Sequence, residues 1–119
     1  MTTPKYMILD NDDNNSKVMT AMLEFFGECI CQVFTSPSQL LDALKQDKPN
    51  KIFCNVTARG CDCRELFENT EINLPFIFIS SLNKSEERRH SYLDSGHPYI
   101  TYPLTIKEIQ KHLKPESNS

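Results

Sequence analysis

Two short apolar runs constrain the fold of this chain more than any other feature. Ile52–Val56 and Phe76–Ile79 are apolar almost throughout instead of alternating with polar residues. This composition is typical of strands in a parallel sheet that is covered on both faces, because a strand with one wet face alternates. Three other segments are predicted as strands of the same sheet: Tyr6–Leu9, Cys29–Phe34 and the weaker Tyr99–Thr101.

Amphipathic helices are predicted between the first strands. In Asn15–Phe26 the apolar residues recur at helical spacing, and Gly27 ends the helix. This stripe consists of Val18, Met19, Met22, Leu23 and Phe26. Ser36 is predicted to cap a second helix, with Pro37 at its first position, where a missing N–H costs nothing. The core-facing residues of the second helix are then Leu40, Leu41 and Leu44, before Pro49 closes the segment.

Three more helices complete an alternating order. They are a short one at Cys63–Glu68, a polar one at Asn83–Ser95, and a last one that starts at Thr105 with Glu108 completing a capping box. The last helix has the apolar stripe Ile106, Ile109 and Leu113. Strand and helix therefore alternate five times, which predicts an α/β fold with a parallel sheet, helices on both faces and right-handed crossovers.

Length and charge limit the class of protein. The chain has 119 residues, the size of one domain with one core, which we expect to span about residues 5–113 with a polar tail at 114–119. Its net charge of -3 gives no general attraction to nucleic acid or to an anionic membrane. The apolar runs are too short to cross a bilayer, and the first residues do not resemble a signal peptide. We therefore expect a cytoplasmic protein with reduced thiols.

Polar residues follow the predicted strands. Asp10 and Asn11 come after the first strand, and Asn55 lies near the end of the third. Ser80 follows the fourth strand, and Tyr102 with Pro103 follows the fifth. Ligands of open parallel sheets bind at the carboxyl ends of the strands, so these are the candidate functional residues.

At these positions the chain resembles the receiver domain of bacterial response regulators, of the chemotaxis type. The stretches that carry the resemblance are IFCNVTARGCDC, PFIFISS and GHPYITYPL. The resemblance implies a flavodoxin-like, doubly wound (βα)5 domain with strand order 2-1-3-4-5. It puts Asp10 and Asn11 at the acidic pair and Asn55 at the phosphoacceptor. The remaining family positions are the switch residues Ser80 and Tyr99, the lysine position at Tyr102, and Pro103 after it.

The departures from the family pattern predict that phosphorylation chemistry is lost. Aspartyl phosphorylation requires a carboxylate nucleophile, a bound Mg²⁺ and a balancing cation. Of the positions that resemble the magnesium site, only Asp10 retains a carboxylate, since the others are Asn11, Asn55 and, past the third strand, Thr57. An amide is no nucleophile for phosphoryl transfer, and Tyr102 brings no positive charge. We therefore expect no enzyme activity, no cofactor, and weak or absent Mg²⁺ binding.

The resemblance also implies how such a domain acts. Family members engage partners, or form dimers, through helix four, strand five and helix five, which correspond here to about Asn83–Leu113. Tyrosine is favoured at interfaces, so the candidate contact residues are Tyr92, Tyr99, Tyr102 and Ile106. We expect a phosphorylation-independent module of a two-component-type or phosphorelay pathway. Its partner would be another protein, a fused output domain or a second copy, and the chain would be free-standing or part of a longer protein.

Three alternatives stay open from the sequence. Asp10-x-Asp12 after an apolar strand, with Ser80 later, resembles the motifs of haloacid-dehalogenase-type hydrolases. A receiver that uses Asp10, Asp12 or Asp13 as its acceptor is a second alternative. The C-x-C pairs Cys29/Cys31 and Cys61/Cys63 suggest metal or redox sensing, although they are predicted at opposite ends of the sheet, and free cysteines are often simply buried.

Overall fold

The structure is a computed structural model, and it describes residues 3–55, 75–80, 98–101 and 104–113. Val56 at the end of the third predicted strand and the predicted helices at 63–68 and 83–95 lie outside the described residues. The cysteines Cys61 and Cys63 lie outside them as well.

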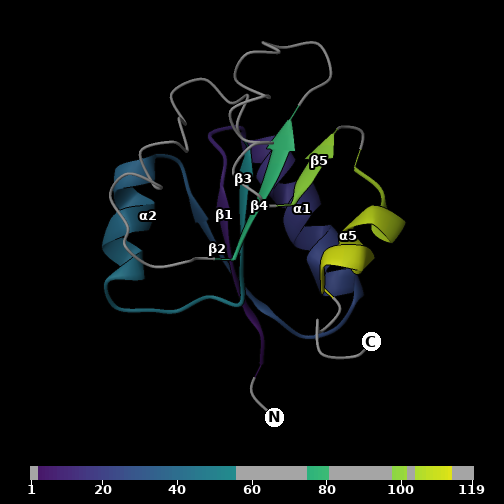
Figure 1. Cartoon of the computed structure of the whole chain (residues 1–119), viewed down its shortest axis with the longest axis horizontal. Coiled ribbons are helices and arrows are strands. Elements are labelled where there is room, and N and C mark those ends of the chain that lie inside the picture. The colour runs from purple at the N-terminus through teal and green to yellow at the C-terminus, as the bar shows by residue number, and fades with distance from the viewer. Residues whose placement is uncertain (1–2, 56–74, 81–97, 102–103, 114–119) are drawn as a thin grey trace.

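A five-stranded parallel sheet forms the centre of the molecule (Figure 1). The strand order is β2-β1-β3-β4-β5, as the resemblance implied, with every neighbouring pair parallel. The strands are β1 (Lys5–Leu9), β2 (Ile30–Phe34), β3 (Lys51–Asn55), β4 (Phe76–Ser80) and β5 (Tyr99–Thr101). All five residues of β4 are buried, which explains why this run does not alternate.

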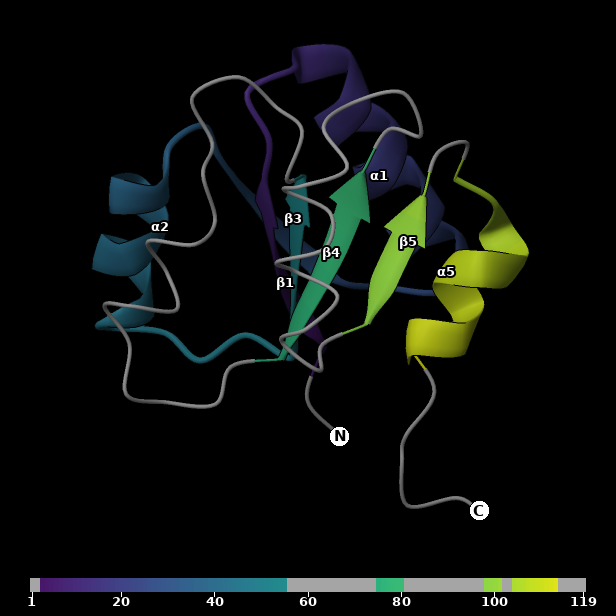
Figure 2. The same ribbon diagram turned by 45° about the horizontal axis from the view of Figure 1, so that its top comes forward.

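Helices cover the two faces of this sheet. The described helices are α1 (Asp13–Phe25), α2 (Pro37–Leu44) and α5 (Ile106–Leu113). Both views place α2 on one face, with α1 and α5 together on the other (Figures 1 and 2). Each face has its own apolar cluster. Leu40 packs with Phe78 on the α2 side, and Met19 and Ile109 pack with Phe53 on the α1–α5 side.

Local capping chemistry fixes where two helices begin. Ser36 Oγ accepts a hydrogen bond from the Gln39 amide at 3.4 Å, and Pro37 occupies the first helical position. Thr105 Oγ1 accepts one from the Glu108 amide at 3.1 Å. Both caps confirm the sequence prediction, because a side-chain oxygen satisfies an amide that the helix itself leaves without a partner.

The structure corrects the prediction for the first helix. The helix begins at Asp13, two residues before the predicted Asn15, because Asp12 serves as its N-cap. Val18, predicted in the buried stripe, is 49% exposed, whereas Ser16 is buried in the row that continues through Met19 and Leu23. The Ser16 hydroxyl is accommodated there because it donates to the carbonyl oxygens of Asp12 and Asp13. In the same part of the chain, β2 begins at Ile30 and not at Cys29.

Candidate functional site

The topology brings three of the predicted site residues to one edge of the sheet. β1 and β3 are neighbours with Leu9 beside Cys54, so the next residues, Asp10 and Asn55, also lie close together. Asn55 pairs with Ile79 in β4, and Ser80 follows Ile79 directly. All three side chains are buried, with 4% exposure for Asp10, 5% for Asn55 and 1% for Ser80.

A direct hydrogen bond joins the two residues that the resemblance puts at the centre of the site. The Asn55 amide nitrogen Nδ2 donates to Asp10 Oδ2 at 2.9 Å, and the bond is buried. The other carboxylate oxygen, Oδ1, accepts the backbone amide of Asp12 at 2.9 Å. Each oxygen of Asp10 therefore has an N–H donor, which offsets the cost of burying its charge.

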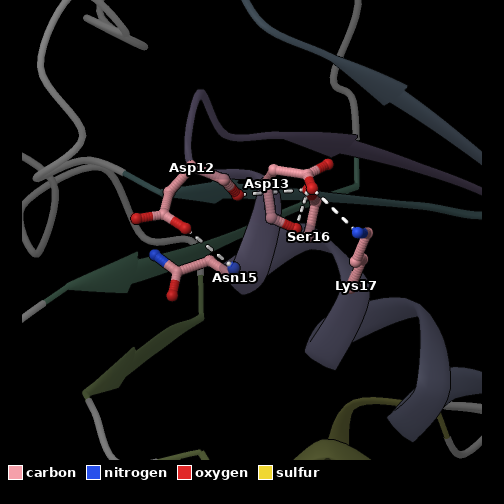
Figure 3. A network of polar contacts seen from close by, with 5 residues as sticks. All are labelled: Asp12, Asp13, Asn15, Ser16 and Lys17. Atoms are coloured by element: carbon pink, nitrogen blue, oxygen red, sulfur yellow. Dashed lines mark hydrogen bonds and ion pairs between the residues drawn. The ribbon is translucent and has the colours of Figure 1, made fainter.

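The acids after Asp10 organise the start of α1 (Figure 3). Asp12 Oδ1 accepts the Asn15 amide at 3.1 Å, as an N-cap does. Asp13 forms an ion pair with Lys17 at 3.0 Å, and both side chains are largely exposed. Acids in the first turn also complement the helix dipole. Asp12 and Asp13 thus stabilise the start of α1.

The remaining predicted site residues divide into two groups. Asn11 is exposed beside the pocket, whereas Tyr99 is half-buried and packs against the apolar cluster on the α2 side. Ile106, predicted as an interface residue, is half-buried at the start of α5. The others lie outside the described residues, so their roles stay predictions: Thr57, Tyr92, Tyr102 and Pro103.

The opposite end of the sheet carries the first C-x-C pair. Cys29 and Cys31 have their sulfur atoms 3.7 Å apart beside Tyr6, and Cys54 is buried in the core on the α2 side. Burial first, and then the hydrogen bond with Cys29 and the charges nearby, raise the pKa of Cys31 to about 12. Among the described residues, no group of three or more histidine, cysteine, aspartate or glutamate side chains is placed to hold a metal ion.

Sequence reasoning identified the residues of this pocket and, in part, their contact. Besides the metal-site interpretation, it allowed for a structural Asp10 that accepts hydrogen bonds from the backbone or from an asparagine, and the structure shows both bonds, with Asn55 as the asparagine. The signal was present, because a neutral amide beside a buried carboxylate in an adjacent strand end is a natural donor for it.

Comparison with solved structures identifies the fold. The chain superposes on a crystal structure from Chloroflexus aurantiacus J-10-fl, assigned as a response regulator, with a TM-score of 0.81 and 18% identity over 95% of this chain and 96% of that one. A response regulator receiver protein from Burkholderia phymatum gives a TM-score of 0.75 at 18% identity, covering 92% and 90%. The fold is therefore that of response regulator receiver domains, five parallel strands in the order 2-1-3-4-5 with helices on both faces.

A third similar structure belongs to a longer protein. Full-length FixJ from B. japonicum matches with a TM-score of 0.78 at 14% identity, over 93% of this chain but only 56% of that one. By sequence, no known family profile matches the chain, and no curated protein does. Within the described ranges, no helix has the length and apolar character to cross a membrane.

Proposed function

We propose that this chain is a receiver-like module that acts without phosphorylation, by binding another protein in two-component-type signalling. The observation that carries the proposal is the buried hydrogen bond from Asn55 to Asp10. It joins the position of the phosphoacceptor to the one carboxylate retained in the pocket. The fold supports the assignment to receiver-like domains. The side chains of Asp10 and Asn55 support the loss of phosphorylation chemistry.

The hydrogen-bond pattern argues against a magnesium site. Asn55 directs an N–H group toward Asp10, and an N–H group cannot ligate a cation. Turning the amide over would set its oxygen against a carboxylate oxygen, which is repulsive. Mg²⁺ requires several oxygen ligands in octahedral geometry, usually with more than one negative charge. The pocket residues therefore fit an internal polar contact better than a metal, and we propose no cofactor and no catalytic reaction.

The three aspartates considered as alternative acceptors have other contacts. Asp10 accepts two hydrogen bonds, Asp12 caps α1, and Asp13 pairs with Lys17. A phosphoryl group on Asp10 would displace one of its contacts, because both of its oxygens accept a hydrogen bond. No feature of the pocket or of the similar structures favours the hydrolase alternative.

We further propose that the partner binds at the face made by the segment before β5, by β5 and by α5. Of the predicted contact residues, Tyr99 and Ile106 are described, and both are half-buried, so each keeps some surface for contact. The partner would be a separate protein or an output domain of a longer chain. We place the module in the bacterial cytoplasm, where reducing conditions suit thiols such as those of Cys29 and Cys31.

A phosphoryl-mimic titration tests the central claim. Beryllofluoride with Mg²⁺ is added to ¹⁵N-labelled protein while the amide signals of Asp10, Asn55 and Ser80 are followed. In parallel, acetyl phosphate is added and the intact mass is measured. We expect no saturable shifts and no added phosphoryl mass.

An adduct, or shifts that spread from the pocket to Tyr99, would overturn the proposal. Asp10→Asn is the matched variant for that case. Loss of the adduct in this variant would identify Asp10 as an unconventional acceptor. An adduct that survives would be mapped by peptide mass to Asp12 or Asp13.

A further inference from the structure

Helix α1 carries two apolar stripes, and only one of them faces the sheet. The inner stripe includes Met19 and Leu23, which are 2% and 1% exposed. The outer stripe consists of Val18, Ala21 and Phe25, which are exposed and follow the spacing i, i+3, i+7. Met22 lies between the two stripes, where it is half-buried and packs against the core. Val18 is 49% exposed and Phe25 is 70% exposed. A helix with one stripe of this spacing buries it, so a second stripe suggests a second packing surface.

Two residues of opposite charge lie along one side of the outer stripe. Lys17 and Glu24 are exposed and have the same seven-residue separation as Val18 and Phe25. Ala21 lies between the charged flank and the apolar flank. The internal partner of Lys17 is Asp13 (Figure 3). The two charged groups are 3.0 Å apart, and their side chains are 73% and 80% exposed. An ion pair this exposed contributes little, so Lys17 is available to another carboxylate.

This arrangement is complementary to itself. If two copies of α1 cross antiparallel about a two-fold axis at Ala21, each flank of the helix meets the same flank of its partner. Lys17 then faces Glu24 of the other copy, and Val18 faces Phe25, while the small Ala21 allows close approach. A parallel crossing would instead set the charged flank against the apolar flank. The pattern therefore selects the antiparallel arrangement.

We propose that the outer face of α1, defined by Lys17, Val18, Ala21, Glu24 and Phe25, is a homodimer interface in which two copies pack antiparallel. None of these residues belongs to the pocket at Asp10 or to β5 and α5, so the proposal does not depend on the function proposed above. One helix pair buries less than the surface of a standard stable interface, so we expect a reversible dimer with a dissociation constant on the order of 100 μM.

Charge reversal tests the pairing directly. Sedimentation velocity over about 10 μM to 1 mM measures the dissociation constant of each sample. Lys17→Glu and Glu24→Lys should each weaken the dimer, by about tenfold or more, because two like-charge contacts replace two attractive ones. Mixing the two variants should restore association, since both contacts of the mixed dimer are again attractive. Lys45→Glu is the matched control, because Lys45 pairs with Asp42 on the exposed face of α2 in the same way.

Phe25→Ser tests the apolar flank. We expect the dissociation constant to rise by at least about tenfold, because each dimer loses two buried rings. Ile30→Ser is the control, since Ile30 is also exposed, at 47%, but lies on the edge strand β2. Circular dichroism of both variants checks that the fold is intact.

Several results would overturn the proposal. The first is a parent protein that stays monomeric at about 1 mM. The second is association that survives Phe25→Ser, or that is not restored when the two charge variants are mixed. Loss of the dimer with Ile30→Ser alone would assign the interface to the edge of β2 and would also reject α1.

Discussion

Polar groups at the two ends of the sheet have different surroundings. At the carboxyl end, Asp10 is 4% exposed and each of its oxygens receives an N–H donor. At the amino end, Cys31 and Tyr6 lie together, and burial raises the pKa of both, to about 12 for Cys31. His112, at the end of α5 and within the influence of Lys51, has its pKa lowered chiefly by burial. All three shifts favour the neutral form.

The difference lies in the hydrogen-bond partners of the groups at each end. Burial disfavours the charged form, but matched donors stabilise a carboxylate enough to offset that cost. At the amino end the thiols donate and accept only weakly, and burial favours the neutral forms of Cys31 and Tyr6. The pocket at Asp10 is thus a satisfied polar contact, whereas the cluster at Cys31 behaves as core.

The largest expected effect comes from removing the donor at the carboxyl end. Asn55→Asp would set a second buried carboxylate against Asp10 and should lower the free energy of unfolding by about 3 kcal/mol at neutral pH. Added Mg²⁺ should restore part of that loss, because the variant then offers two charged ligands. Urea denaturation with and without Mg²⁺ measures both effects.

Asn50→Asp is the control for this change. Asn50 is exposed at the other end of the sheet, and its side-chain oxygen accepts the Lys5 amide at 2.8 Å, a contact that aspartate retains. Its expected effect is below about 0.5 kcal/mol. If Asn55→Asp is as stable as the parent, the contrast between the two ends of the sheet fails.

A smaller effect is expected from the acid that starts α1. Asp12→Ala should cost about 1 kcal/mol, because the Asn15 amide loses its capping oxygen. Asp12→Asn should cost only a few tenths of a kcal/mol, since asparagine caps equally well. Thermal unfolding of the two variants distinguishes a cap from a charged ligand. Equal losses in both would mean that the charge of Asp12 matters beyond capping.

Alkaline pH should reduce the contribution of the amino end of the sheet to the free energy of unfolding. A group whose folded pKa is raised contributes stability that is present below its unfolded pKa and lost as pH rises toward the folded value. For Cys31 the window runs from its ordinary pKa of 9.0 to about 12. Between about pH 9 and 10 the parent should lose on the order of 1 kcal/mol or less, because the site is partly exposed to solvent.

Cys31→Ala should flatten this decline, and denaturant titrations at several pH values measure it. Alkylation offers a second readout, since the raised pKa should keep Cys31 slow to react in the folded protein relative to the unfolded one. A decline that is unchanged in the variant would assign the loss to Tyr6 or to another group.

The smallest effect concerns His112. Its folded pKa is lowered, so its contribution to stability is present above the ordinary value of 6.5 and lost as pH falls through the folded value. Because the ring is only half-buried, we expect less than about 0.5 kcal/mol. NMR titration of the ring should give a pKa below 6.5, and His112→Gln should remove the matching acid-side loss of stability. A pKa above 6.5 would mean that Glu108, which pulls the other way, outweighs burial.

Much of the fold was predictable from local patterns. The non-alternating runs at β3 and β4 indicated buried parallel strands, and the caps at Ser36 and Thr105 were visible as short motifs. These features depend on neighbours within a few residues. The one error of packing, Val18, came from a helix with two apolar stripes, because periodicity alone does not say which stripe faces the sheet.

By itself, then, the sequence determined the strands, the capped helix starts, and which polar residues stand at the strand ends, since each follows from local chemistry and periodicity. Only the tertiary structure decided that Asn55 donates to Asp10, that Ser16 is buried in place of Val18, and that Cys31 lies against Tyr6. The physical reason is that β1 lies between β2 and β3, so the contacts across these strands join residues far apart in the chain. Their hydrogen bonds depend on which side chains the sheet brings within reach.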